Sequence, residues 1–357
     1  MSSLRGQVIG GLKQWRDRME PKRSVLLTED AFLKLWTAQA VSTLGSQITF
    51  VALPLTAAAV LGASPAQMGL LGIVEYVPFI LFGLLAGAWV DRLPRRAVMV
   101  VADLVRAAIL VSVPAAALAG RLTMEHLYIV AFVGNTLTAF FDAALQAYVP
   151  SVVRKALLIE ANSMLQVVYS LARIAGPALA GLLSSWFAAP LVITLDAVSF
   201  LISAILLSTI RATESTSTSR TGHRSIWHEI GAGLSSVWRN PMLLAIAGSG
   251  ATFNLFHIAM GAVFILFLTQ YLHLDQASVG MIFAVSNIGS LVGAALAGPV
   301  RRRLELGTTL IISLVGAAVG RVVVSLSDDL PFMAFWWLLL GVVPDGPHAS
   351  HLQRQPS

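Results

Sequence analysis

Long apolar runs alternate with short polar stretches along most of the chain. Each run is about 20 residues long, the length that an α-helix needs to cross the hydrocarbon core of a bilayer. The runs are continuously apolar rather than alternating, so they predict helices and not the strands of a barrel. We therefore predict an all-α polytopic membrane protein, with spans near residues 31–61, 66–90, 97–118, 125–150, 157–187, 190–210, 242–270, 276–299 and 307–326 and a tenth that begins near 331.

The last predicted span is short. It is apolar for thirteen residues before Pro344, and a helix of that length reaches only ~20 Å across a ~30 Å core. We therefore expect an ending typical of a frameshifted or truncated product. The predicted units are a basic tail (1–30), a bundle of six spans (31–210), a central loop (211–241), an incomplete second bundle (242–343) and an aberrant polar tail (344–357).

Composition agrees with a membrane protein. The chain is 56% hydrophobic and 12% charged, whereas a soluble domain carries roughly 25% charged residues. It has no cysteine, which excludes disulfides, thiolate metal sites and cysteine nucleophiles. We expect no metal and no other cofactor. The net charge of +6 would suggest a nucleic-acid partner in a soluble protein, but in a membrane protein Lys and Arg mark the cytoplasmic loops.

The basic residues are distributed unevenly between the two sides of the predicted bundle. Nineteen of the 24 Lys and Arg residues lie in the N-terminal segment or in the loops after spans two, four, six and eight. The opposite loops contribute only Arg121. By the positive-inside rule, this asymmetry predicts a cytoplasmic N-terminus.

The loop between the second and third spans carries a recognisable motif. It reads GAWVDRLPRR, and its key residues are Gly87, Asp91, Arg92, Arg95 and Arg96. A plain interpretation is a cytoplasmic turn held by its arginines beside a packing glycine. The pattern also resembles the loop motif of the major facilitator superfamily of transporters, in which it has a gating role. It departs from that motif at Pro94, where the family often has glycine.

Three other segments extend the resemblance over about residues 25–340. The stretch 172–181 is similar to the Gly-Pro motif of antiporter-type facilitators, and Gly176 with Pro177 would bend its span. Residues 103–106 and 196–200 resemble the branch that contains macrolide-efflux proteins and the enterobactin exporter.

The resemblance implies both a fold and a function. The fold would be the six-plus-six helix arrangement, here lacking the last two spans and part of span ten. The function would be export of an amphipathic drug, antibiotic or siderophore in exchange for protons, by alternating access. The protein would act as a monomer in the lipid bilayer of a bacterial cytoplasmic membrane.

Polar residues recur at helical spacing on several spans, so each of these spans has one wet face. For any single residue, hydrogen bonding between helices is the more frequent role. The set as a whole is better explained by a central aqueous cavity. The cavity-lining candidates are Gln39, Thr43, Gln47, Asn135, Thr138, Asp142, Gln166, Asn254 and His257.

Ionisable residues inside the spans are functional candidates. Glu75, Arg173 and Asp196 lie at similar depths, ~22–24 Å from the inner ends of their helices at 1.5 Å per residue, and are the proton-coupling candidates. For the shallower Asp103, Arg106 and Asp142, structural ion pairs are the favoured interpretation. His257 is a further candidate proton relay.

Two alternative functions remain at this stage. The unusual C-terminus also fits a non-transporting remnant or a membrane sensor, and the fold also fits uptake of a metabolite. An enzyme is not expected, because the chain has no cysteine and neither a His-Glu-x-x-His nor a Gly-x-Ser-x-Gly motif.

Overall fold

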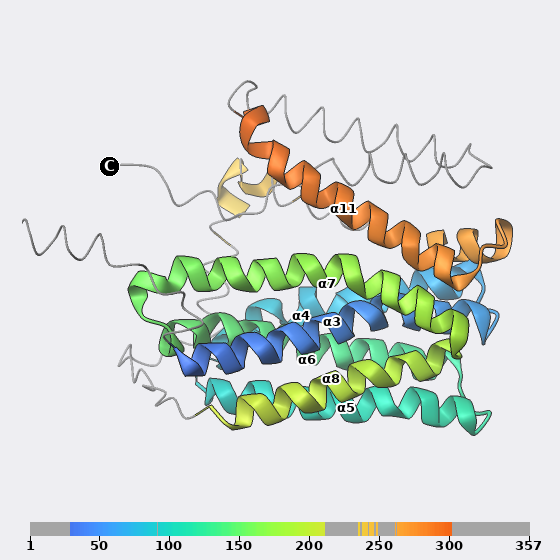
Figure 1. Cartoon of the computed structure of the whole chain (residues 1–357), viewed down its shortest axis with the longest axis horizontal. Coiled ribbons are helices and arrows are strands. Elements are labelled where there is room, and N and C mark those ends of the chain that lie inside the picture. The colour runs from blue at the N-terminus through green and yellow to red at the C-terminus, as the bar shows by residue number, and fades with distance from the viewer. Residues whose placement is uncertain are drawn as a thin grey trace, which may run out of the picture.

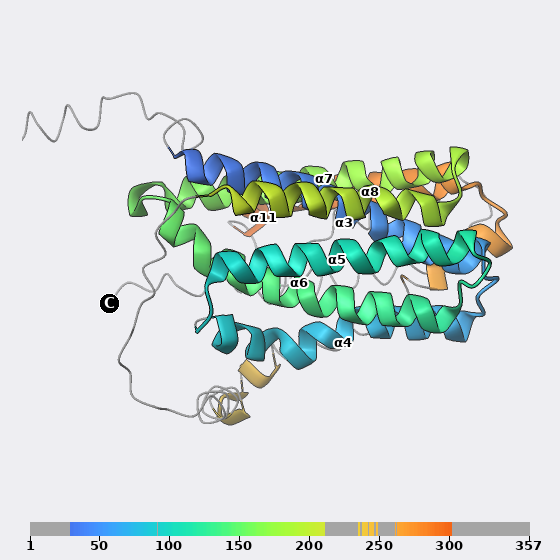
Figure 2. The ribbon, with the colours of Figure 1, turned by 90° about the horizontal axis from the view of Figure 1, so that it is seen from below.

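The computed structural model describes residues 29–90, 92–210 and 263–301, with scattered positions between 235 and 261. Its described part is dominated by long helices that run nearly parallel to one another along the longest axis of the molecule (Figures 1 and 2). Six of them are long and apolar enough to cross a membrane. They are α3 (Asp30–Ala59), α4 (Pro65–Val90), α5 (Arg95–Leu118), α6 (Met124–Val152), α7 (Leu158–Trp186) and α8 (Ala189–Ser208).

These helices begin and end within a few residues of the first six predicted spans. Five of the six contain an internal proline, as in Pro54 of α3 and Pro177 of α7. Membrane helices tolerate proline because neighbouring groups satisfy the freed backbone. α7 remains one continuous helix through Pro177.

The second half of the chain is described in part. The segment expected to be the seventh span ends in a short π-helical turn, η2 (Phe267–Tyr271), and α11 (Gln276–Arg301) confirms the eighth. The ninth and tenth predicted spans and the polar tail lie outside the described residues.

The helices pack in a definite order. α3 lies against α8 and α7, α5 against α8 and α6, and α4 against α6. α11 packs against α7 and therefore joins the second half of the chain to the first. We call the end where α3 begins the proximal end and the end where it finishes, at Ala59, the distal end.

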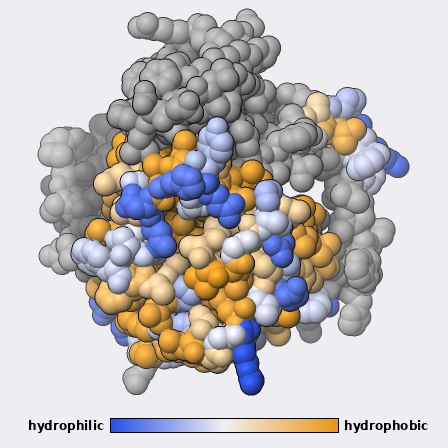
Figure 3. Space-filling model, turned by 90° about the vertical axis from the view of Figure 1, so that its right-hand side faces the viewer, coloured by the Kyte–Doolittle hydropathy of each residue, from blue (hydrophilic) through white to orange (hydrophobic). Residues whose placement is uncertain are grey.

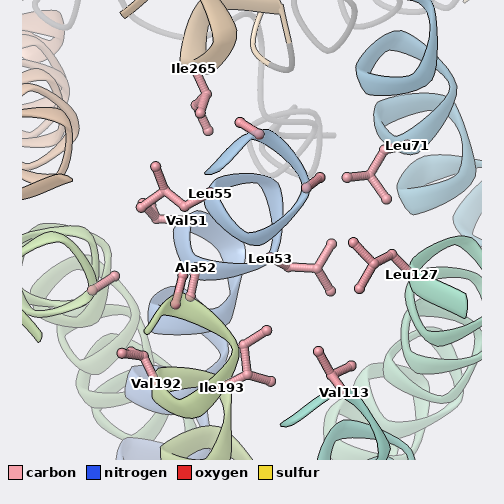
Figure 4. Close-up of a cluster of buried hydrophobic side chains, with 14 of the residues drawn as sticks. Val51, Ala52, Leu53, Leu55, Leu71, Val113, Leu127, Val192, Ile193 and Ile265 are labelled. Atoms are coloured by element: carbon pink, nitrogen blue, oxygen red, sulfur yellow. The ribbon is translucent and has the colours of Figure 1, made fainter. Parts of the chain in front are cut away.

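Two hydrophobic clusters hold the bundle, one near each end. The distal cluster includes Leu53, Leu71, Val113 and Ile193 from the first bundle and also Ile265, from the segment before η2 (Figure 4). The proximal cluster draws its buried members from α3 to α8 and the turns that follow α6 and α8. Within the described residues, therefore, the two halves of the chain share a core at the distal end.

The outer surface of the bundle is strongly apolar. Ile80 and Leu118 are each 79% exposed, and Ile205 is 63% exposed. A soluble protein seldom exposes so many large apolar side chains, whereas a lipid-facing surface requires them. Viewed from the distal end, hydrophilic residues lie among hydrophobic ones at the tips of the helices (Figure 3). This distribution is that of a multi-pass membrane protein.

Candidate functional site

A layer of polar residues lies between the two hydrophobic clusters. On α3 the proximal cluster ends at Ala38 and the distal cluster begins at Ile48, and the residues between them include the polar stripe 39–47. On α5 the corresponding boundary falls between Ala102 and Ala107. On α6 and α8 the polar residues extend past this boundary, because Asp142 lies beside Phe141 of the proximal cluster and Asp196 lies between Ile193 and Ala197 of the distal cluster. The layer lies midway along the bundle, where a purely structural membrane core would be apolar.

Arg106 is the centre of this layer. Its guanidinium forms an ion pair with Asp103, one turn earlier on α5. It also donates a hydrogen bond of 3.2 Å to the hydroxyl of Thr138 on α6. Its Cζ atom lies 4.6 Å from the ring centre of Phe141 and 4.1 Å from that of Phe200, within the range of cation–π attraction. One cation thus ties together α5, α6 and α8.

Two further carboxylates lie close enough to Arg106 to feel its charge. They are Asp142 on α6, which is half-buried, and Asp196 on α8, which is 2% exposed. The hydroxyl of Ser199 donates to the Asp196 carboxylate over 3.1 Å, and Thr49 of α3 lies beside the same carboxylate. We call Asp103, Arg106, Asp142 and Asp196 the Arg106 cluster.

α3 approaches the cluster closely at Gly45. A Cβ atom added there would collide with Ser199 and would lie 2.5 Å from an oxygen of Asp196. Only glycine therefore fits at this crossing of α3 and α8. The backbone of α3 is thus pressed directly against the Asp196 carboxyl group.

The grouping of Asp196 differs from the expectation from depth along the helices. Depth along the helices groups Asp196 with Glu75 and Arg173, whereas in the structure it lies close enough to Arg106 to feel the charge of the guanidinium. The reason is rotational, because α8 packs against both α3 and α5 and turns Asp196 into their interface. The expected ion pair of the shallower trio is present between Asp103 and Arg106.

Glu75 and Arg173 lie on helices that pack in different places. Glu75 is half-buried on α4, which packs against α6. Arg173 is on α7, which packs against α3 and α11, and its guanidinium lies 5.8 Å from the ring centre of Tyr169. No ion pair joins Glu75 to Arg173 in the described structure.

The candidate cavity residues have varied surroundings. Gln39 donates to Thr43 over 3.0 Å, and Asn135 donates to a carbonyl of its own helix over 2.9 Å. Gln166 is exposed on α7, and Gln47 packs against Gly176 of the same helix. Asn254 and His257 lie outside the described residues.

The arginines of the loop motif bind helix ends. Arg95 donates to the Ala147 carbonyl of α6 over 3.0 Å. Arg96 donates to the Leu207 carbonyl over 2.9 Å and also to that of Ser208, at the end of α8. Cations at helix C-termini satisfy free carbonyls and complement the helix dipole. Of the other motif residues, Gly87 is half-buried, Arg92 is exposed in the turn, and Asp91 lies outside the described residues.

Replacing Arg96 by glutamine is therefore expected to destabilise the proximal end by about 1–2 kcal/mol, because the last carbonyls of α8 lose a charged donor. Thermal unfolding of the purified protein measures this change. The matched control is Arg92→Gln, which removes an exposed arginine of the same loop. Equal melting temperatures for the two variants would contradict this role.

Glycines form the crossings of α7. A Cβ at Gly176 would collide with Gln47 of α3. A Cβ at Gly181 would lie 2.7 Å from the Cα of Gly280 on α11, and one at Gly280 would lie equally close to the Cα of Gly181. The two halves of the chain therefore touch backbone to backbone near the distal end. Toward Arg301, α11 diverges from α7 (Figure 1).

Comparison with known proteins supports this architecture. The chain is 26% identical over 267 residues to macrolide efflux protein A of Streptococcus pyogenes, covering 75% of this chain and 66% of that protein. It is 26% identical over 308 residues to the multidrug efflux pump Tap of Mycolicibacterium fortuitum, covering 84% and 74% of the two chains. The chain thus spans about two thirds of the length of the macrolide efflux relative.

Solved transporter structures share the fold. The nucleoside transporter NupG matches with a TM-score of 0.70 at 13% identity, covering 88% of this chain and 79% of that one. A bacterial homologue of the iron transporter ferroportin, in an inward-facing state, matches with a TM-score of 0.64 at 16% identity, covering 90% and 81%. The family description of the Major Facilitator Superfamily matches residues 35–343. With its helices, loop motif and α7 glycines in this arrangement, the chain belongs to the Major Facilitator Superfamily.

Proposed function

We propose that this protein exports small amphipathic molecules of the drug, antibiotic or siderophore type in exchange for protons. The observation that carries this proposal is the similarity to macrolide and multidrug efflux proteins over three quarters or more of the chain. The ionisable layer in the middle of the bundle supports the proton-coupled form of it, because ionisable groups inside a membrane mark pathways for ions and substrates.

The orientation follows from the basic loops. With its N-terminus in the cytoplasm of a bacterial cell, the proximal end faces the cytoplasm and the distal end faces outside. The contact between Gly181 and Gly280 then closes the outer end. This arrangement is the inward-facing half of an alternating-access cycle, in which the two bundles rock about a central site.

A polar face on α7 supports a wet route from the proximal end. Asn162, Gln166 and Tyr169 are exposed, and Arg173 follows them on the same side of the helix. Such side chains facing hydrocarbon would be unfavourable, so this face is expected to meet water or a polar ligand. Aromatic and hydrogen-bonding groups together suit a substrate that has both apolar and polar parts.

Export is tested by expressing residues 1–357 in a host that lacks its own efflux pumps and is preloaded with ethidium, a fluorescent amphipathic cation. The proposal predicts faster loss of ethidium than in the empty host, and loss of that difference when a protonophore collapses the proton gradient. Ethidium uptake through the folded protein would favour an uptake facilitator instead. Retention of ethidium despite correct folding would favour a sensor or a non-transporting product.

A further inference from the structure

We infer that the Arg106 cluster is a proton-binding centre in which Asp103, Asp142 and Asp196 share protons around one guanidinium. This inference rests on the proposed proton-coupled function and gives it a location inside the first bundle. The centre lies between α3, α5, α6 and α8, at the interface that fixes how these helices pack. It differs from the pair of Glu75 and Arg173 that helix depth alone would select.

The Arg106 cluster contains more acidic groups than basic ones. The cluster contains Asp103 and Arg106 on α5, Asp142 on α6 and Asp196 on α8. On the helices packed around it, Glu75 of α4 and Arg173 of α7 also lie between the two hydrophobic clusters. The facing part of α3 contributes only neutral groups such as Thr49, and Arg173 of α7 lies over Tyr169 instead. Three ionised carboxylates beside one cation would leave two negative charges uncompensated inside the bundle, which is unfavourable. Protons on the carboxylates remove that imbalance.

Buried oxygen atoms beside Arg106 have no hydrogen-bond partner within the described residues. Asp103 and Ser203 are both fully buried, and the Ser203 hydroxyl lies beside the Asp103 carboxylate. Asp103 Oδ2 and Ser203 Oγ have no hydrogen-bond partner in the part of the chain that the structure describes. Buried polar atoms are seldom left unpaired. Arg106 Nε also has no partner among the described residues, although Arg106 Nη2 donates to Asp103 Oδ1. A proton on Asp103 Oδ2 would provide a donor for Ser203 Oγ and would pair both oxygen atoms.

The carboxyl groups of the cluster differ in how accessible they are and in which helix they touch. Asp142 is half-buried, whereas the other two carboxyl groups are buried, and it lies on the same face of α6 as Asn135 and Thr138, so it is the most accessible carboxyl group of the cluster. Asp196, by contrast, is pressed against Gly45 of α3. Uptake of one proton forms one O–H bond on a carboxylate and makes the cluster less negative by one unit, with no redox change. Such a change acts directly on the crossing of α3 and α8, which is how proton binding would reach helix packing.

Infrared difference spectroscopy on the purified chain in lipid vesicles tests this inference without requiring transport. Protonated carboxyl groups have a C=O band separate from that of carboxylates, and the band shifts in D₂O. We expect this band at neutral pH, loss of part of it in Asp103→Asn and in Asp196→Asn, and its disappearance from the parent protein on alkaline titration. The control is Asp275→Asn, a change at an exposed residue before α11, which should leave the band unchanged.

Three outcomes would overturn the inference. They are absence of the band in the parent protein, its persistence in the Asp103→Asn, Asp142→Asn and Asp196→Asn triple variant, and its complete loss in Glu75→Gln. If an asparagine variant fails to fold, counting protons taken up by the parent protein on acidification of an unbuffered solution gives the same answer. Comparison with Asp275→Asn gives the proton uptake of an exposed carboxylate. Uptake of fewer than one proton in addition to that of the surface groups would refute the inference.

A second measurement separates this inference from the proposed function. Addition of ethidium to the unbuffered parent protein should release protons, and Asp142→Asn should lose that release. Export without the infrared band would agree with the proposed function and contradict the proton-binding centre. The band without export would keep the centre and contradict the proposed function.

Discussion

Replacing Gly181 by alanine is expected to separate α7 from α11 at the distal end and to favour the state that is open there. The added Cβ would lie 2.5 Å from the carbonyl oxygen of Gln276 and 2.7 Å from the Cα of Gly280. Both atoms belong to backbone, so neither can rotate aside and the helices themselves must move. Overpacking of this kind costs about 1–3 kcal/mol, which corresponds to a change of about fivefold to more than a hundredfold in the population of the closed state.

Accessibility of a single cysteine measures this effect. Val279 is fully buried beside the crossing, and the chain has no native cysteine to interfere. A cysteine at this position should react slowly with a membrane-impermeant maleimide in the parent background and at least about fivefold faster with Gly181→Ala. Gly83→Ala on α4 is the control, because nothing lies within 4 Å of a Cβ there. Equal rates in both variants would show that the glycine crossing does not hold the distal end closed.

Replacing Arg106 by methionine is expected to destabilise the first bundle by about 3–5 kcal/mol, because it removes the cation of a cluster of three carboxyl groups, two of which are buried. It also removes the contacts of the guanidinium with Phe141 and Phe200. Thermal unfolding and the yield of monodisperse protein report the loss. Arg106→Lys keeps the charge but not the planar donor geometry. Its stability should therefore fall between that of the parent protein and that of Arg106→Met.

A second substitution tests whether the damage is electrostatic. Adding Asp103→Asn to Arg106→Met should recover part of the stability, because one uncompensated charge is removed together with the cation. The loss should also shrink on acidification, since neutral carboxyls no longer need the guanidinium. Simple additivity of the two substitutions at neutral pH would contradict the cluster, because residues in direct contact are expected to show an interaction energy.

The sequence was sufficient to predict the helices but not their rotation. Apolar runs of span length gave the first six helices and α11 to within a few residues, because the bilayer sets the length of a span. The polar stripes of α3 and α6 were also predictable, since helical spacing places them on one face. Depth along a helix, however, says nothing about which neighbour a residue faces. Asp196 was therefore grouped with Glu75, whereas packing of α8 against α3 and α5 brings it to Arg106.

The closure of the distal end shows the same limit. In sequence, residues 172–181 resemble a Gly-Pro motif, but the partner of Gly181 is a glycine on α11, far along the chain. No local pattern pairs the two, because the pairing depends on how the bundles meet. The loop motif is an intermediate case. Its arginines were expected to hold the loop, and the structure adds that they bind the Ala147 carbonyl in the C-terminal part of α6 and the Leu207 carbonyl at the end of α8.

The central claim, that the two bundles alternate between states open at opposite ends, is tested most directly by two distances measured in the same protein. Spin labels on cysteines at Phe187 and Asp275 report the distal end, and labels at Ser163 and Leu291 report the proximal half; all four positions are exposed on or beside α7 and α11. Ethidium and a shift of pH are the perturbations. The account predicts that the distal distance lengthens as the proximal distance shortens. Two distances that stay fixed, or that change in the same direction, would contradict it.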